Sequence, residues 1–165
     1  MDMSENNIQN IIKPNWEEID VVRASSEEFL SRKNLSQDTL HSISMVSGEL
    51  VENAVKYGSF KNDDQRIVHS IDIRENTITV EVKNPLDDDS EEVLERLDHQ
   101  IQWIRGYQNP FEAYVEKLKG ISENDNDDDD ESGLGLVRIA YEGQSILDFY
   151  VDENNILSIS AVYRY

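Results

Sequence analysis

ELVENAVKYG, residues 49–58, is the stretch from which the rest of this sequence is best interpreted. Its apolar residues recur at helical spacing, and the closing Gly58 is typical of a helix end. Glu49 and Asn53 are four residues apart and Lys56 follows Asn53 by three, so a helix presents all three side chains along one side. The pattern indicates one of two structures, a phosphate-and-metal site or a solvated helix edge.

The helix that contains this stretch is expected to begin at Ser36, because Ser-x-x-Thr is a plausible N-cap, and to end near Gly58. Its expected apolar face is Leu40, Ile43, Val46 or Ser47, Leu50, Val51, Ala54 and Val55. An earlier helix is expected over residues 16–33, where the apolar residues Trp16, Ile19, Val22 and Phe29 recur at near-helical spacing. Residues 1–15 are either a tail or an edge strand.

After this helix the pattern changes from helical spacing to alternation, which is typical of strands. IVHSIDIRE and TITVEVKN predict a β-hairpin around Asn76, with inward residues Ile67, Ile71, Ile73, Ile78, Val80 and Val82. Two helices are expected over residues 90–105 and 110–120, the second with the apolar residues Phe111, Tyr114, Val115 and Leu118. SGLGLVRIAYEG then predicts a loop that leads into a helix, and SILDFYV with ILSISAVYRY predicts a closing hairpin.

This order of elements predicts an α+β fold, an antiparallel sheet with helices packed on one face. The 165 residues are enough for one domain, expected over residues 16–165. The chain is 38% hydrophobic and 30% charged, has no cysteine, and has no apolar run of the roughly 20 residues that would span a bilayer. These features favour a cytoplasmic protein that does not bind a membrane.

The net charge of −20 argues against nucleic acid as a ligand, because phosphate backbones are bound by clustered Lys and Arg. It favours protein partners with basic patches. The acidic residues are concentrated, since residues 87–98 and residues 123–131 hold seven each. Such blocks are typical of solvated loops.

SGLGL, residues 132–136, is a second polar and glycine-containing motif. A helix N-terminus presents backbone N–H groups and a partial positive charge, which suit phosphate. Gly133 and Gly135 would let an anion approach the backbone without a Cβ in the way. Taken alone, the motif predicts either a phosphate site or a tight junction between loop and helix.

The two motifs in this order, with two strands between them and a hairpin after them, resemble the GHKL ATPase and kinase superfamily. The resemblance covers about residues 16–165 and implies the Bergerat, or histidine kinase-like ATPase, fold. Because the compact domain has no helix with a phosphoacceptor histidine, it looks most like the anti-sigma-factor and SiaB-type serine kinases. The stretch from VKNP to SGLGLVRIAY is particularly similar to the SiaB-type group.

The resemblance implies ATP and Mg²⁺ as cofactors and assigns roles to residues of this chain. Asn53 matches the asparagine that coordinates Mg²⁺, and Glu49 matches the glutamate that acts as general base. Lys56 falls where a basic residue often approaches the phosphates. The second glycine box, whose N–H groups hold the triphosphate, corresponds to Gly133, Leu134, Gly135 and Leu136.

The sequence departs from the family pattern after the TITVEVKN strand, where an Asp-x-Gly-x-Gly box is usual. VKNPLDDDSEEVLE has no glycine there, and Asn84 stands near the place of the aspartate that binds the adenine amine. The carbonyl of Asn84 could accept that hydrogen bond, and one of the aspartates at 87–89 is the alternative. The segment that closes over the phosphates in the family corresponds here to an acidic lid loop over about residues 121–131.

Two functions are compatible with these features. The first is a switch kinase of the anti-sigma type that binds Mg-ATP and phosphorylates Ser or Thr of a small partner protein, an antagonist or a sigma-like regulator. The second is a module that has kept the fold, lost catalysis, and regulates by binding a partner. The sheet edge and the aromatic helices at 90–120 also offer surfaces for a homodimer.

Overall fold

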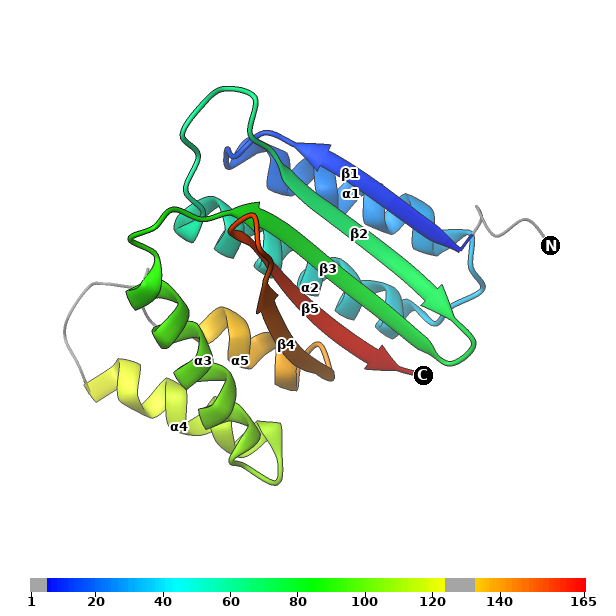
Figure 1. Cartoon of the computed structure of the whole chain (residues 1–165). Coiled ribbons are helices and arrows are strands. Elements are labelled where there is room, and N and C mark those ends of the chain that lie inside the picture. Colours follow the sequence, from blue (N-terminus) through cyan, green and yellow to red (C-terminus); the bar gives the residue numbers. More distant parts are fainter. Residues whose placement is uncertain (1–5, 124–132) are drawn as a thin grey trace.

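The computed structural model describes residues 6–123 and 133–165 of the chain. Its strands are β1 (Asn7–Ile12), β2 (Ile67–Arg74), β3 (Thr77–Pro85), β4 (Ser145–Val151) and β5 (Ile156–Arg164). They form one sheet in the order β1-β2-β3-β5-β4, in which every neighbouring pair is antiparallel (Figure 1). Both predicted hairpins, β2–β3 and β4–β5, are therefore confirmed, and β1 and β4 are the edges of the sheet.

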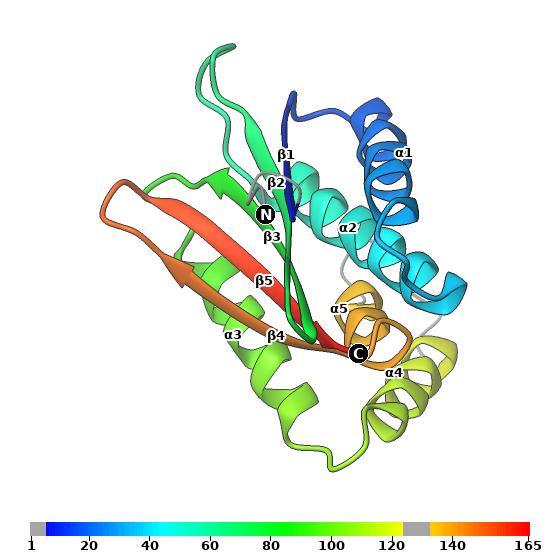
Figure 2. The same ribbon diagram turned by 90° about the vertical axis from the view of Figure 1, so that its right-hand side faces the viewer.

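The helices are α1 (Glu17–Ser31), α2 (Gln37–Tyr57), α3 (Glu91–Arg105), α4 (Pro110–Glu123) and α5 (Leu134–Tyr141). Three of them, α1, α2 and α5, cover one face of the sheet, which Figure 2 shows from the side. The α3 and α4 helices follow β3 in the chain and pack against α5 and against each other. The predicted α+β fold with its helices on one face is confirmed.

The α2 helix is the longest described element and has the predicted ends. The Ser36 Oγ accepts a hydrogen bond from the backbone N–H of Thr39 at 3.1 Å, and the Gly58 N–H donates to the carbonyl of Ala54 at 3.0 Å. Its predicted apolar face lies in the core, with only Val55 partly buried. Among the described residues, no helix is both long enough and apolar enough to cross a membrane.

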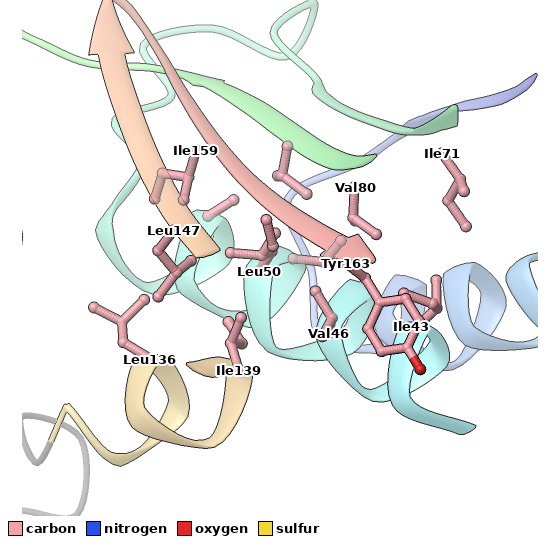
Figure 3. Packing of buried hydrophobic residues seen from close by; sticks show 14 of the residues in the cluster. Ile43, Val46, Leu50, Ile71, Val80, Leu136, Ile139, Leu147, Ile159 and Tyr163 are labelled. Atoms are coloured by element: carbon pink, nitrogen blue, oxygen red, sulfur yellow. The ribbon is translucent and has the colours of Figure 1, made fainter. Parts of the chain in front are cut away.

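The hydrophobic core lies between this helical layer and the inner face of the sheet. Figure 3 shows Val46 and Leu50 of α2 and Ile139 of α5 directed toward side chains of the strands. The predicted inward residues of the first hairpin are all buried: Ile67, Ile71, Ile73, Ile78, Val80 and Val82. Residues that alternate with them in β2 and β3 are only partly buried, as expected when one face of an antiparallel sheet is covered.

Trp16, one of the residues whose spacing predicted the first helix, does not belong to the core. It lies at the N-cap position just before α1, and 54% of its surface is exposed. Its ring lies 5.9 Å from the Lys56 ammonium, a distance at which a cation and an aromatic face attract each other. Trp16 has helical backbone angles, so the predicted start of this helix is confirmed to within one residue although the side chain lies at the surface.

The apolar face predicted for α4 is also largely outside the core. Phe111 and Leu118 are 46% and 40% exposed, and Ala113 is the residue of this helix that is fully buried. The physical reason is that α4 packs on α5 and not on the sheet, so no second layer covers its apolar stripe. Phe111 instead contacts Tyr141 at the end of α5, with ring centroids 5.2 Å apart.

A fully buried histidine, His69, sits among the inward residues of β2. Its Nδ1 is 3.2 Å from the amide nitrogen of Asn10, and its Nε2 is 2.9 Å from Ser47 Oγ. Because an amide NH₂ can only donate, Nδ1 accepts and the proton of the neutral ring lies on Nε2, which donates to Ser47. Ser25 Oγ donates in turn to Asn10 Oδ1 at 3.0 Å, so one polar network joins β1, β2, α1 and α2.

This network makes the stability of the fold depend on pH. Burial lowers the pKa of His69 from its ordinary 6.5 to about 4, so its stabilising contribution is complete above pH 6.5 and is lost as the pH falls toward 4. Between pH 7 and pH 4, the unfolding free energy of the unaltered protein should fall by up to about 3 kcal/mol more than that of His69→Gln. Urea denaturation across this pH range measures the difference.

His41→Gln is the matched control, because His41 is exposed on α2. Its unfolding free energy should follow that of the unaltered protein at every pH. A constant difference between the unaltered protein and His69→Gln from pH 7 to pH 4 would show that His69 is not held neutral by the fold.

Candidate functional site

A cavity of about 420 Å³ lies beside α2, between that helix, α3, α4, the start of α5 and the ends of β3 and β5. This volume is within the usual range for small-molecule sites. The residues predicted from the two sequence motifs and from the strand end all border it: Glu49, Asn53, Lys56, Asn84, Gly133, Leu134, Gly135 and Leu136. The fold therefore brings together segments that are up to 87 positions apart in the sequence, from Glu49 to Leu136.

Glu49 is the most enclosed charged residue of this cavity, with 8% of its surface exposed. Its Oε1 accepts a hydrogen bond from Arg138 Nη1 at 2.6 Å, so an ion pair joins α2 to α5. Burial raises the pKa of the Glu49 carboxyl above its ordinary value, and the Arg138 guanidinium offsets part of that rise. The result is a carboxylate held in a partly dry site with a defined orientation.

The turn into α5 lies so close to its neighbours that a Cβ at either of two glycines would force a neighbouring side chain to move. Gly133 has a φ of +67°, in the left-handed region, and a Cβ there would be 2.5 Å from Gln100 Nε2. A Cβ on Gly135 would be 2.6 Å from Glu49 Oε2. The two glycines therefore let the first turn of α5 approach α3 on one side and Glu49 on the other.

Asn53 and Lys56 lie further along the same side of α2. Asn53 is half-buried and borders the cavity, one helical turn after Glu49. The Lys56 ammonium also borders it and lies 3.2 Å from Glu52 Oε1, so the positive charge of Lys56 is shared with a carboxylate of its own helix. In residues 6–123 and 133–165, no group of three His, Asp or Glu side chains could hold a metal ion, so Asn53 would have to share a metal with the oxygens of a bound ligand.

Asn84 also borders the cavity, on the inner face of β3, and is 3% exposed. Its amide nitrogen donates to the carbonyl of Pro85 at 3.1 Å, which leaves the amide oxygen able to accept a hydrogen bond from a ligand. The aspartates at 87–89, the alternative from the sequence, do not line the cavity. Asp87 accepts from the hydroxyls of Ser59 and Ser90, which lowers the pKa of its carboxyl and holds the turn between β3 and α3.

The comparison with known families decides the assignment of this fold. The model of the histidine kinase-like ATPase domain matches residues 12–141. The chain belongs to the histidine kinase-like ATPase family. It is also similar to a chain in the crystal structure of the SiaB–SiaC complex from Pseudomonas aeruginosa, with a TM-score of 0.70 and 20% identity over 94% of this chain and 88% of that one. At that identity the likeness shows the shared fold, and no curated protein matches the sequence significantly.

A histidine kinase-like ATPase implies a bound nucleotide, and the residues of this cavity fit one. The close approach of the α5 turn, which a Cβ at either glycine would block, leaves backbone N–H groups of a helix N-terminus beside the cavity. Asn53 offers an amide oxygen, the type of ligand that Mg²⁺ prefers. Asn84 offers a hydrogen-bond acceptor, and Leu157 and Ile159 of β5 add apolar residues to the lining.

Several residues that line this cavity of the histidine kinase-like ATPase were missed by the sequence interpretation. Arg96 and Gln100 reach the cavity from α3, Leu118 and Ile121 from α4, and Arg138 from α5. Arg138 carried a signal that could have been used, because it follows Leu134 by four and must share its helix face. The other residues had no such signal, since they depend on how the α3–α4 pair folds back over α5.

The net charge of the cavity lining is opposite in sign to the net charge of the whole chain. Among the described residues that line it, Lys56, Arg96 and Arg138 are positive, and Glu49 and Glu52 are negative. This local excess of one positive charge stands in a chain whose net charge is −20. A triphosphate would therefore meet a more favourable surface here than the overall charge suggests.

The acidic lid loop predicted over residues 121–131 requires one correction. Residues 121–123 are helical, because α4 continues to Glu123, and Ile121 borders the cavity. Residues 124–132, which hold most of the acidic block, lie outside the described residues.

Gly135→Ala should reduce the unfolding free energy by about 1–3 kcal/mol, because the added Cβ forces Glu49 away from Gly135 and strains its pair with Arg138. Urea denaturation of both proteins measures the loss. In a Glu49→Ala background the loss should shrink, since the clashing carboxylate is then absent.

Gly120→Ala is the matched control for this substitution. Gly120 is helical in α4 and a Cβ there meets nothing within 4 Å, so the change should be neutral or stabilising by up to about 1 kcal/mol. Equal effects at Gly120 and Gly135 would contradict the close contact between Gly135 and Glu49.

Proposed function

We propose that this histidine kinase-like ATPase is a regulatory switch kinase that binds Mg-ATP and phosphorylates Ser or Thr of a small partner protein. The observation that carries the proposal is the meeting of the two motifs, in which Glu49 and Asn53 of α2 face the glycine turn of α5 across one cavity. Phosphoryl transfer depends mainly on positioning and on neutralisation of charge, and this cavity supplies groups for both.

The nucleotide, when bound with its metal, supplies the phosphoryl group and much of the charge neutralisation at the phosphates. Asn53 would be the protein ligand of the metal. The first turn of α5 and the ammonium of Lys56 would stabilise the triphosphate, and Asn84 would accept a hydrogen bond from the base. These roles use cavity residues from α2, α5 and β3.

Glu49 would receive the proton of the attacking hydroxyl. A general base works best when its pKa lies near the working pH, and burial raises the pKa of Glu49 in that direction. The carboxylate is also fixed in direction, since one oxygen is bound by Arg138 and the other lies against Gly135. A base with this geometry acts only on a hydroxyl that is brought to one place.

A protein substrate is supported by two observations. The similar chain with a TM-score of 0.70 comes from a complex of two proteins, SiaB and SiaC. The net charge of −20 favours a partner with a basic patch. An antagonist or a sigma-like regulator, a cytoplasmic location and a homodimer all remain predictions of this proposal.

A second function, partner binding without turnover, is favoured by one departure from the family pattern. The region after β3 has no glycine box. In that case the half-exposed apolar residues of α4, Phe111 and Leu118, would be the contact surface for the partner. The two functions differ in whether phosphate is ever released from ATP.

Asn53→Ala should abolish the dependence of ATP binding on Mg²⁺, because it removes the protein's oxygen ligand to the metal. Calorimetric titration of ATP and ADP, with and without Mg²⁺, measures this effect. The matched variant Glu49→Gln keeps the shape of the side chain and should bind Mg-ATP, while its release or transfer of labelled phosphate falls by about 100-fold or more.

Equal Mg-ATP affinity in Asn53→Ala and the unaltered protein would show that Asn53 is not the metal ligand. Binding of Mg-ATP without any release or transfer of labelled phosphate would favour the second function. No heat at millimolar nucleotide would exclude the first.

A further inference from the structure

The ion pair between Glu49 and Arg138 is a direct contact between α5 and the proposed general base. The two charged groups are 2.6 Å apart and come from positions 89 residues apart in the sequence. A charge-assisted hydrogen bond of this length is strong and directional. The pair is also partly shielded from water, because 11% of the Glu49 side chain is exposed. Its geometry is therefore better defined than that of an exposed ion pair.

Both oxygens of the Glu49 carboxylate lie close to the same helix, and one of them is hydrogen-bonded to it. Oε1 accepts from Arg138, and Oε2 lies where a Cβ on Gly135 would come within 2.6 Å. Gly135 and Arg138 are three residues apart on α5 and thus on one side of it. The direction of the carboxylate consequently follows the position of α5 relative to α2.

Arg138 is itself held in place by a second acid. Its Nε lies 3.2 Å from Glu142 Oε2, one helical turn further along α5. The planar guanidinium can bind two carboxylates at once through different nitrogens, which a lysine ammonium does with less directional control. This second contact restricts the conformations of the Arg138 side chain and so favours the one that binds Glu49.

Other charges act on Glu49 without replacing Arg138. Arg23 of α1 and Lys56 of α2 favour the ionised carboxylate, and Glu52 of α2 opposes it. Arg138 has the strongest effect among these charged groups. Arg138 also donates a hydrogen bond directly to the Glu49 carboxylate.

We propose that Arg138 is a positioning residue that holds the Glu49 carboxylate in the orientation needed to receive a proton from the acceptor hydroxyl. The inference rests on the proposed function, because it assigns Arg138 a role in the same reaction. In the transfer, the O–P bond to the leaving ADP breaks as the acceptor oxygen bonds to phosphorus, and the acceptor proton passes to Glu49. Arg138 neither gains nor loses a proton in this step.

The experiment measures single-turnover release of labelled phosphate from Mg-ATP, with water as the acceptor, together with calorimetric affinity for Mg-ATP. Arg138→Met should lower the release rate by about tenfold or more, because the carboxylate loses its fixed direction, and this loss should exceed any loss of nucleotide affinity from removing one positive charge at the cavity. Arg138→Lys should recover part of the rate, since it restores the charge but not the fork of donors. Arg32→Met is the matched control, because it breaks an exposed Arg–Glu pair on α1, away from the cavity.

Combining Arg138→Met with Glu49→Gln distinguishes positioning from a separate role in binding or catalysis. If Arg138 acts through Glu49, the double variant should release phosphate no more slowly than Glu49→Gln alone. A further loss in the double variant, or a loss of Mg-ATP affinity that parallels the rate, would overturn the inference. An unchanged rate in Arg138→Met would also overturn it.

The same set of variants tests the pair even where no phosphate is released. Unfolding free energies of Arg138→Met, Glu49→Gln and the double variant should be non-additive, as expected for residues in direct contact. Additive effects would overturn the inference whatever the activity. Non-additive effects in a protein that never releases or transfers phosphate would instead overturn the proposed kinase function and leave the contact intact.

Discussion

The structure depends on the packing of α2 against the sheet. This helix has an apolar stripe that faces β3 and a polar side that faces the cavity. Because the helical period sets the angle between the two sides, packing of the apolar stripe on the sheet also determines where the polar side points. Because Leu50 and Ala54 are buried beneath the helix, Glu49 and Asn53 must stand at its flank, where the sheet no longer covers it. The hydrophobic core thus determines which polar groups can meet a ligand.

The α5 helix completes the site through the same core. Leu136 and Ile139 pack among the buried residues, so the position of the helix is set by apolar contacts, and Gly135 and Arg138 are carried to Glu49 as a result (Figure 3). The polar contacts at the cavity wall therefore follow from the apolar packing of α5 in the core. This arrangement explains how two short motifs, distant in the sequence, come to share one cavity.

The sequence was sufficient for the features that depend on periodicity and insufficient for those that depend on how separate segments meet. The ends of α2, both hairpins and the inward residues of β2 and β3 follow from local patterns, and the structure has them. The exposure of Phe111 does not follow from its own helix, because it depends on the absence of a sheet beneath α4. The contact of Gln100 with Gly133 likewise joins two segments whose approach no local pattern describes.

The polar network around His69 also restricts how the edge strand can be attached. Ile8, Asn10 and Ile12 of β1 lie opposite Ile71, His69 and Ile67, and only in this pairing does the Asn10 amide meet the ring nitrogen of His69. A shift by one residue would turn Asn10 to the opposite face of the sheet and leave a buried ring nitrogen without its donor. Two purely apolar faces would tolerate such a shift more readily. The buried His69 thus favours one alignment of β1 with β2. A protein in which β1 is paired out of register is less stable than the native one.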